Sequence, residues 1–227
     1  MDLMDTAVVK GTLADGTEVL AVTVQAGTAP DAWRTLRAAH ASTGLWPFLV
    51  DPHTPTILDK LPRPVQEKER HRGAAEIFGT AEFFATAEFF ATAEFFAVAE
   101  TFATTDARGS ADVAPDQPPH TGQVSSAVRA TTIGLVPAEY GGVEVPGLLD
   151  WDGAPGTSGL EHTAVLADWR RRFGAELMTL TGDRIELHVP RPPATPEGIK
   201  AVALEQTGYC PDVLFQSGGT LWSFQWE

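Results

Sequence analysis

Cysteine is nearly absent from this chain of 227 residues, which contains Cys210 and no other. One cysteine cannot form an intrachain disulfide, and it cannot supply a zinc site built from several thiolates. Basic side chains are also scarce: 16 Lys and Arg stand against 30 Asp and Glu, which gives a formal net charge of −14. Because nucleic-acid phosphates repel such a chain, we expect no nucleic-acid partner.

Long hydrophobic runs are missing as well. No stretch approaches the roughly 18 apolar residues that a membrane span requires, so we expect no membrane partner. The first five residues, MDLMD, have neither the basic region nor the apolar run of a secretory signal. We therefore expect a cytoplasmic protein.

The common catalytic signatures are absent too. The chain has no glycine-rich phosphate loop, no nucleophile elbow and no His-Glu-x-x-His pair. No cofactor is expected on these grounds, and the identity of any catalytic residue stays unknown.

What the chain does have is an internal repeat of five six-residue units, from Ala74 to Ala103. The units read AAEIFG, TAEFFA three times, and VAETFA. In an α-helix each six-residue step turns the pattern by about 120°, so successive Phe pairs point in three directions. A helix that is apolar all round must be covered by its own protein or by a partner. The interaction candidates are therefore the paired phenylalanines Phe83, Phe84, Phe89, Phe90, Phe95 and Phe96.

Other structures for the repeat stay open. A strand would show one Ala-Phe-Ala face in every copy, but 30 unbroken residues far exceed the usual strand length. A β-helix would need more than two coils, and disorder is a further alternative. The identical copies are also typical of a recent duplication that only lengthens a helix. We predict one continuous helix over residues 74–103.

The rest of the chain has a globular composition, 43% hydrophobic and 20% charged. Alternating patterns, turns and helix caps predict strands at residues 6–13, 18–25, 45–50, 124–136, 176–180, 184–189, 213–215 and 220–226, and helices at 28–44, 158–174 and 195–208. Pro47 places the third strand at an edge or a bulge. Residues 137–159 are predicted to form a long loop.

This mixed order predicts an α+β fold, a mainly antiparallel mixed sheet with helices packed on it. We expect a single domain over residues 1–227, with the repeat helix inserted and residues 104–122 forming an exposed linker. Two similar units occur in the sequence: each is a helix that contains a Trp, ends at a glycine and is followed by a strand. Their similarity suggests two helices on one face of the sheet. The expected core comprises Trp33, Leu36, Leu45, Phe48, Val165, Trp169, Phe173, Ile185, Leu187, Val202, Leu214, Trp222, Phe224 and Trp226.

Several segments resemble a known family. They are AWRTLR at 32–37 with TGLWPFL at 43–49, the helix containing Trp169, VPRPP at 189–193, YCPD at 209–212 and the ending WSFQWE. Together they resemble the bacterial family called domain of unknown function 4253. Two departures stand out: the repeat, and the apparent loss of a short helix between Asp212 and Trp222. The resemblance implies one domain and no activity, so it assigns no catalytic residue.

The best metal-like group is formed by Asp150, Asp152 and His162. Two carboxylates lie one residue apart in a loop, and an imidazole follows at a helix start; such ligands suit Mg, Mn or Zn. Aspartates are also routine turn residues, so a purely structural role is the alternative. Asp51 and His53 form a similar, weaker pair, and Cys210 could be either a thiol nucleophile or a small core residue.

Two function hypotheses follow. The first is a non-catalytic cytosolic interaction protein, of the immunity or antitoxin type, that binds a protein partner or itself through its acidic surface and Phe-rich repeat. The second is a metal-assisted hydrolase or small-ligand enzyme that uses Asp150, Asp152 and His162.

Overall fold

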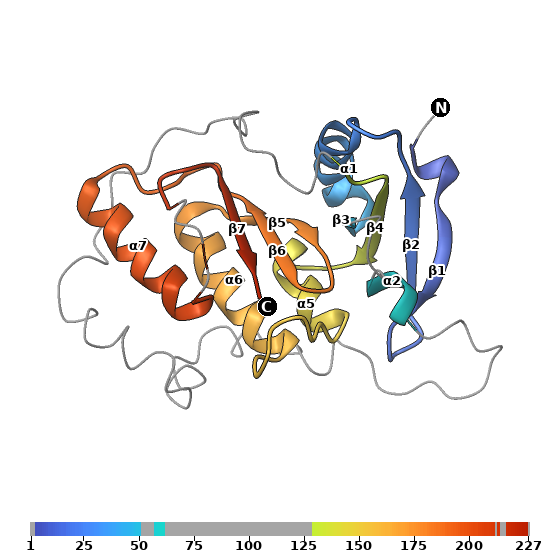
Figure 1. Cartoon of the computed structure of the whole chain (residues 1–227). Coiled ribbons are helices and arrows are strands. Elements are labelled where there is room, and N and C mark those ends of the chain that lie inside the picture. The colour runs from blue at the N-terminus through green and yellow to red at the C-terminus, as the bar shows by residue number, and fades with distance from the viewer. Residues whose placement is uncertain (1–2, 51–56, 62–128, 212, 214–216, 227) are drawn as a thin grey trace.

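The computed structural model describes residues 3–50, 57–61, 129–211, 213 and 217–226 (Figure 1). The repeat at 74–103, with its six paired phenylalanines, lies outside the described residues, as do the predicted linker at 104–122 and Leu214. The long helix therefore stays a prediction. None of the helices in the described ranges has the length and apolarity needed to cross a bilayer.

The N-terminal part of the chain forms the elements η1 (Leu3–Thr6), β1 (Val8–Thr12), β2 (Glu18–Thr23), α1 (Ala29–Thr43), β3 (Leu45–Val50) and α2 (Ile57–Lys60). The C-terminal part forms β4 (Thr132–Pro137), η5 (Gly141–Glu144), α5 (Val145–Leu148), α6 (Gly159–Phe173), β5 (Glu176–Leu180), β6 (Arg184–His188), α7 (Pro196–Tyr209) and β7 (Leu221–Gln225). The predicted loop at 137–159 was wrong in part, because it contains η5 and α5.

All seven strands of the described chain lie in one sheet, in the order β1-β2-β4-β3-β5-β6-β7 (Figure 1). Neighbouring strands are antiparallel except β3 and β5, which are parallel. The α+β class with a mainly antiparallel mixed sheet is therefore confirmed. β4 inserts between β2 and β3, which precede it in sequence by more than 80 residues.

Local sequence signals account for the element boundaries. The turn between β1 and β2 closes through Gly16, whose φ of 84° suits glycine, and through the bond from Thr17 N to Asp15 Oδ1 (2.8 Å). Ser158 and Glu161 form a capping box at the start of α6. Helices α1 and α6 both end at a glycine with left-handed backbone.

The predicted edge position of the strand containing Pro47 was wrong, because β3 is central. Its pairing with β5, however, is confined to Leu49 and Thr179. At the Pro47 end, Trp33 Nε1 donates to the Pro47 carbonyl (2.9 Å) and Trp46 Nε1 donates to the Leu177 carbonyl (3.0 Å). Two indoles thus bond to backbone carbonyls where β3 and β5 diverge, so the missing N–H of proline breaks no strand pairing.

Helices α1 and α6 cover opposite faces of the sheet, not one face as the similarity of the two units suggested. His188 pairs with Leu221, and Trp222 is the next residue, so His188 and Trp222 point to opposite sides. Trp33 of α1 contacts His188, whereas Trp169 of α6 contacts Trp222. The similarity therefore reflects two helix–strand units whose strands pair in parallel.

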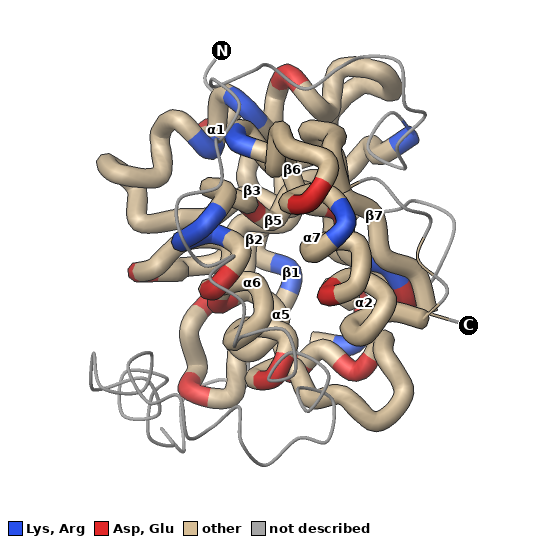
Figure 2. The backbone as a smooth tube through the Cα atoms, turned by 90° about the vertical axis from the view of Figure 1, so that its left-hand side faces the viewer, with Lys and Arg blue, Asp and Glu red and all other residues tan. Residues whose placement is uncertain are grey.

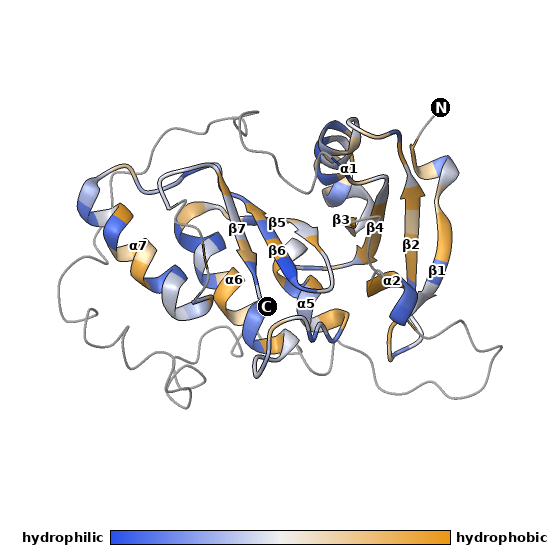
Figure 3. Cartoon of the chain, in the orientation of Figure 1, coloured by the Kyte–Doolittle hydropathy of each residue, from blue (hydrophilic) through white to orange (hydrophobic). Residues whose placement is uncertain are grey.

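The predicted core is largely correct. Apart from Leu214, its members are buried, except Leu45 and Val165, which are half-buried. Figure 3 shows β2 and β4 mainly apolar and the helices two-faced. Large buried side chains that the prediction omitted include Trp46 and Trp151.

Gly134 of β4 provides a stability test. A Cβ there would lie 2.3 Å from Cζ of Phe48, whose side chain is fully buried. We expect Gly134→Ala to lower the free energy of unfolding by about 1–3 kcal/mol, because the overpacked ring cannot move away. Urea unfolding measures this loss of stability. Gly182→Ala is the matched control, since a Cβ there meets nothing within 4 Å. Equal stability of the two variants would contradict this packing.

Candidate functional site

His162 lies at the centre of an aromatic cluster built from four separate parts of the chain. Its ring makes edge contacts with Trp151, Tyr209 and Trp226, at centroid distances of 4.7, 5.4 and 5.4 Å. Helix α6 supplies His162, α7 ends at Tyr209, Trp226 follows β7 and Trp151 follows α5. Trp151 is held by a bond from its Nε1 to the Thr181 carbonyl (2.6 Å). The cluster thus links the two helices to the last strand.

Burial determines the chemistry of His162. Its side chain is fully buried, and Nδ1 lies 2.5 Å from the Tyr209 hydroxyl oxygen. Nε2 is buried without a hydrogen-bond partner among the described residues. Burial lowers the pKa of His162 to about 4, although nearby Glu161 opposes this, and burial raises the pKa of Tyr209. At neutral pH the imidazole is therefore uncharged and closed off from solvent.

The structure does not bring Asp150, Asp152 and His162 together as a metal site. Asp150 is exposed in a turn with φ 47°, and Asp152 pairs with Lys60 (3.0 Å), which lowers its pKa. The Asp152 side chain is 75% exposed, whereas His162 is buried in the aromatic cluster. Within the described ranges no three His, Cys, Asp or Glu side chains are placed to hold a metal ion. Asp150 thus lies in a turn, as the structural alternative expects, and Asp152 lies in the loop that follows it. Asp51 and His53 lie outside the described residues.

Cys210 is a buried residue at the end of α7. Its side chain is fully buried, and Sγ donates to the Gln225 carbonyl (3.2 Å). A nucleophilic cysteine is usually partly exposed, in a positively charged setting that favours the thiolate. The environment of Cys210 instead fits a small core residue.

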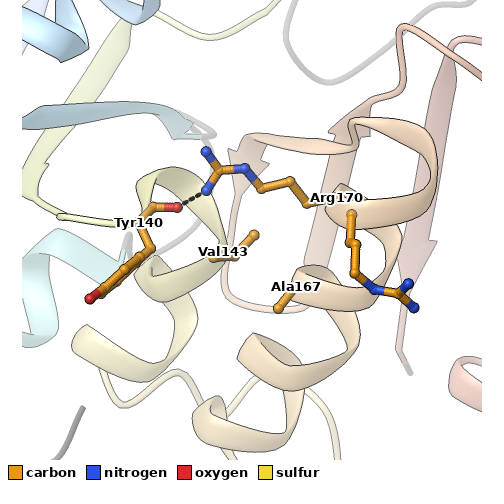
Figure 4. Close-up of a pocket in the computed structure, with 5 residues that line it drawn as sticks. Tyr140, Val143, Ala167 and Arg170 are labelled. Atoms are coloured by element: carbon orange, nitrogen blue, oxygen red, sulfur yellow. Dashed lines mark hydrogen bonds between the residues drawn. The ribbon is translucent and has the colours of Figure 1, made fainter. Parts of the chain in front are cut away.

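A surface hollow lies elsewhere, between η5 and α6. We call it the η5–α6 groove; its lining residues are Tyr140, Val143, Ala167, Arg170 and Arg171, and its volume is about 350 Å³. Figure 4 shows Tyr140 and Val143 on the η5 side and Ala167 and Arg170 on α6, with Arg170 bonded to the Tyr140 carbonyl. The lining combines apolar side chains with two guanidinium groups.

Contacts on the buried side of η5 fix this element, which forms one wall of the groove. The Glu144 carboxylate accepts a bond from Tyr140 N (2.8 Å), and Gly141 has φ 73°. Burial raises the pKa of Glu144, while its bond to Tyr140 N opposes that shift. Gly142 packs so closely on Trp46 that an added Cβ would lie 2.5 Å from the indole nitrogen. These contacts make η5 a fixed wall.

The three consecutive arginines of α6 have different surroundings. Arg172 pairs with Asp168 (2.9 Å) and Glu205 (2.8 Å), and these carboxylates raise its pKa against the effect of burial. Arg170 is fixed on the Tyr140 carbonyl. Arg171 is 74% exposed and pairs with Asp168, which lies one turn earlier on the same helix (2.5 Å). Its charge is the one most accessible to a ligand.

A comparison with protein families matches residues 132–227 to a family described as "Domain of unknown function (DUF4253)". That segment, 96 of the 227 residues, is similar to this family. No curated protein and no solved structure matches the chain. The aromatic cluster around His162 and the η5–α6 groove both lie within the DUF4253 segment.

The DUF4253 segment does not form a continuous sheet by itself. Its first strand, β4, is separated from β5 by β3, which lies outside the matched residues. The resemblance noted at residues 32–37 and 43–49 falls in α1 and β3, likewise outside the match. The N-terminal elements therefore complete the sheet on which the DUF4253 segment folds.

Sequence reasoning missed both features of the DUF4253 segment. It identified His162 but not Tyr209, which is 47 residues away and has no motif that links the two. It placed the groove-forming residues 137–159 in a loop, because Gly141, Gly142 and Pro146 are typical of loops. The three consecutive arginines at 170–172 are the one visible signal, and in the sequence they are equally typical of charges that suit the C-terminal end of a helix.

Proposed function

We propose that this protein is a non-catalytic, cytoplasmic interaction protein, comparable in role to an immunity or antitoxin protein. It acts by binding a protein partner, or a second copy of itself, through its acidic surface and its Phe-rich repeat. The formal net charge of −14 and the six paired phenylalanines support this role.

The observation that carries the proposal is the lining of the η5–α6 groove. That lining consists of Tyr140, Val143, Ala167 and two arginines, with no carboxylate, imidazole or thiol among them. Such a surface can bind an apolar, acidic segment, but it has no general base or nucleophile. Among the described residues, His162 and Cys210 are both fully buried. Figure 2 shows acidic and basic positions spread over many elements.

Shortening the repeat tests the proposal. Deleting residues 86–97 removes two complete TAEFFA units. We expect the full chain to show a concentration-dependent mass above its 24.3 kDa monomer in sedimentation, and the shortened chain to associate at least about tenfold more weakly, a difference of about 1.4 kcal/mol. The physical reason is the loss of four phenylalanines that need cover from water.

A matched control deletes residues 107–118, which are equally numerous and contain no phenylalanine. It should associate like the full chain. A full chain that stays monomeric at high concentration, together with a repeat deletion that unfolds the protein, would show that the repeat belongs to the core. Metal analysis of the purified protein distinguishes this role from that of a metal-assisted enzyme. Stoichiometric bound metal that is lost in Asp152→Ala would contradict a non-catalytic role.

A further inference from the structure

We propose that protonation of His162 opens the C-terminal end of the fold locally, so that Trp226 leaves the aromatic cluster while the rest of the sheet stays folded. This acid-sensitive switch goes beyond the proposed interaction role, since it uses no residue of the repeat. Three properties of the described residues carry the inference: the hydrogen bonding of the imidazole, the charges around it, and the position of Trp226 at an edge of the sheet.

The site of His162 suits the neutral imidazole and not the charged one. Nδ1 lies 2.5 Å from the Tyr209 hydroxyl oxygen, and Nε2 is buried without a hydrogen-bond partner in the part of the chain that the structure describes. When Nδ1 carries the single proton of the neutral ring, Nε2 needs no acceptor. An imidazolium has an N–H on both nitrogens, so its Nε2–H would be unpaired in a side chain that is fully buried. Burial of such an uncompensated charge is strongly unfavourable.

The carboxylate next to His162 on its own helix does not offset this effect. The Glu161 side chain accepts bonds from Ser158 N (2.7 Å) and Ser158 Oγ (2.8 Å) in the capping box. Its charge favours the imidazolium, but burial outweighs that attraction, and the pKa of His162 lies at about 4. The strongest local attraction is therefore too weak to stabilise a charged ring in the closed cluster.

The elements packed around His162 supply no free counter-charge among the described residues. Helix α7 contributes the Tyr209 hydroxyl and the Cys210 thiol, which are ordinarily uncharged below neutral pH. Glu227, which follows Trp226, lies outside the described residues. The other charged groups nearby in the chain are exposed or bonded to other groups: Asp150 is exposed, Asp152 pairs with Lys60, Asp168 and Glu205 pair with Arg172, and the hairpin residues Asp183 and Arg184 bond to Thr181 and Gln225.

Trp226 lies where local opening requires the least disruption. It follows β7, the last strand in the order of the sheet, which pairs only with β6 (Figure 1). Its backbone N donates to the Asp183 carbonyl (3.0 Å). The other rings around His162 are Tyr209, which belongs to a helix, and Trp151, whose indole is bonded to the Thr181 carbonyl (2.6 Å). Chain ends at sheet edges open more readily than the interior of a fold, so the Trp226 end is the part that yields.

Release of Trp226 uncovers Cys210, which provides a natural reporter. The Cys210 Sγ donates to the carbonyl of Gln225 (3.2 Å), the residue just before Trp226. The ring of Tyr209, just before Cys210, also contacts the Trp226 ring, at 5.3 Å between centroids. Cys210 is fully buried and is the only cysteine of the chain. Its reaction with a thiol reagent therefore measures opening of this end of the fold in the unaltered protein.

Labelling of the full wild-type chain with 4,4′-dithiodipyridine tests the proposal. Each rate is divided by the rate for the urea-unfolded chain at the same pH, which removes the pH dependence of the thiol chemistry itself. Between pH 7 and pH 5 we expect the corrected rate to rise about 20-fold, because the open form binds the proton with an ordinary pKa near 6.5 and the closed form with a pKa of about 4. In His162→Phe, whose ring cannot titrate, the rise should stay below about twofold.

A second reporter separates local opening from unfolding of the whole protein. Val22→Cys is combined with Cys210→Ala, so that the new thiol is the only one. Val22 is fully buried in β2, which is separated from β7 by four strands of the sheet. At pH 5 we expect the corrected labelling rate at residue 22 to be at least about tenfold lower than that of Cys210 in the wild type.

A corrected Cys210 rate that does not change between pH 7 and pH 5, or one that rises equally in His162→Phe, would overturn the proposal. Equal corrected rates at residue 22 and at Cys210 at pH 5 would overturn it too, because the opening would then be global. If His162→Phe does not fold, the wild-type pH profile and the comparison with residue 22 still decide the outcome.

Discussion

Replacing Trp169 with alanine is expected to lower the free energy of unfolding by about 3–5 kcal/mol, the range for removing a large buried side chain. Trp169 is 2% exposed. Its indole stacks on Phe224 (5.2 Å between centroids), and its edge contacts Tyr209 and Trp222. Its Nε1 also donates to Glu205 Oε2 (3.2 Å). The substitution leaves a cavity where α6, α7 and β7 meet. Denaturant unfolding at neutral pH measures the loss.

Two further variants define what the Trp169 experiment shows. Trp169→Phe retains an aromatic ring in the cluster but loses the bond to Glu205, so we expect a smaller loss. Leu204→Ala, on the exposed side of α7, should change stability by less than about 0.5 kcal/mol. A loss below about 1 kcal/mol for Trp169→Ala would mean that α6 presents a different face to the sheet.

Acid is expected to destabilise the protein through His162 before most carboxylates titrate. The pKa of His162 is about 4 in the folded protein, whereas an unfolded chain has the ordinary value near 6.5. Below pH 6.5 the unfolded state therefore binds the proton first, and stability falls as the pH drops toward 4. Between pH 7 and pH 4.5 this contribution amounts to about 2–3 kcal/mol.

The variant His162→Phe isolates this effect, because it fills the site with a ring that cannot titrate. Its free energy of unfolding should fall by about 2–3 kcal/mol less than that of the wild type over the same pH range. Tyr209→Phe is the control: it removes the hydroxyl at Nδ1 but leaves His162 buried, so it should retain most of the pH dependence. The same pH dependence in the wild type and in His162→Phe would show that His162 is not buried in its neutral form.

These two predictions concern one structural unit. Helix α6 contributes His162 and Trp169 to the aromatic cluster on its buried side, and Ala167, Arg170 and Arg171 to the η5–α6 groove on its other side. A rigidly anchored helix is a favourable base for a docking surface, because little order has to be gained on binding. The aromatic cluster thereby explains how an open, shallow groove can have a fixed shape.

The elements themselves could be predicted from the sequence. The turn at Asp15 and Gly16, the capping box at Ser158 and the glycine stops at Gly44 and Gly174 all depend on backbone geometry within four or five residues. Sterics and short-range hydrogen bonds decide such features, so they are visible in a local stretch of sequence. The alternation of Trp222, Phe224 and Trp226 is a local pattern of the same kind, typical of a strand with one aromatic face, and all three side chains are buried.

Only the tertiary structure decided how the elements meet. The insertion of β4 between β2 and β3, the central position of the strand with Pro47, and the opposite placement of α1 and α6 all depend on pairings between distant segments. The pairing of His162 with Tyr209 and the groove between η5 and α6 arise in the same way. Such contacts leave no periodic or local signal, because the free energy that selects them comes from burying surfaces that the chain brings together only when it folds.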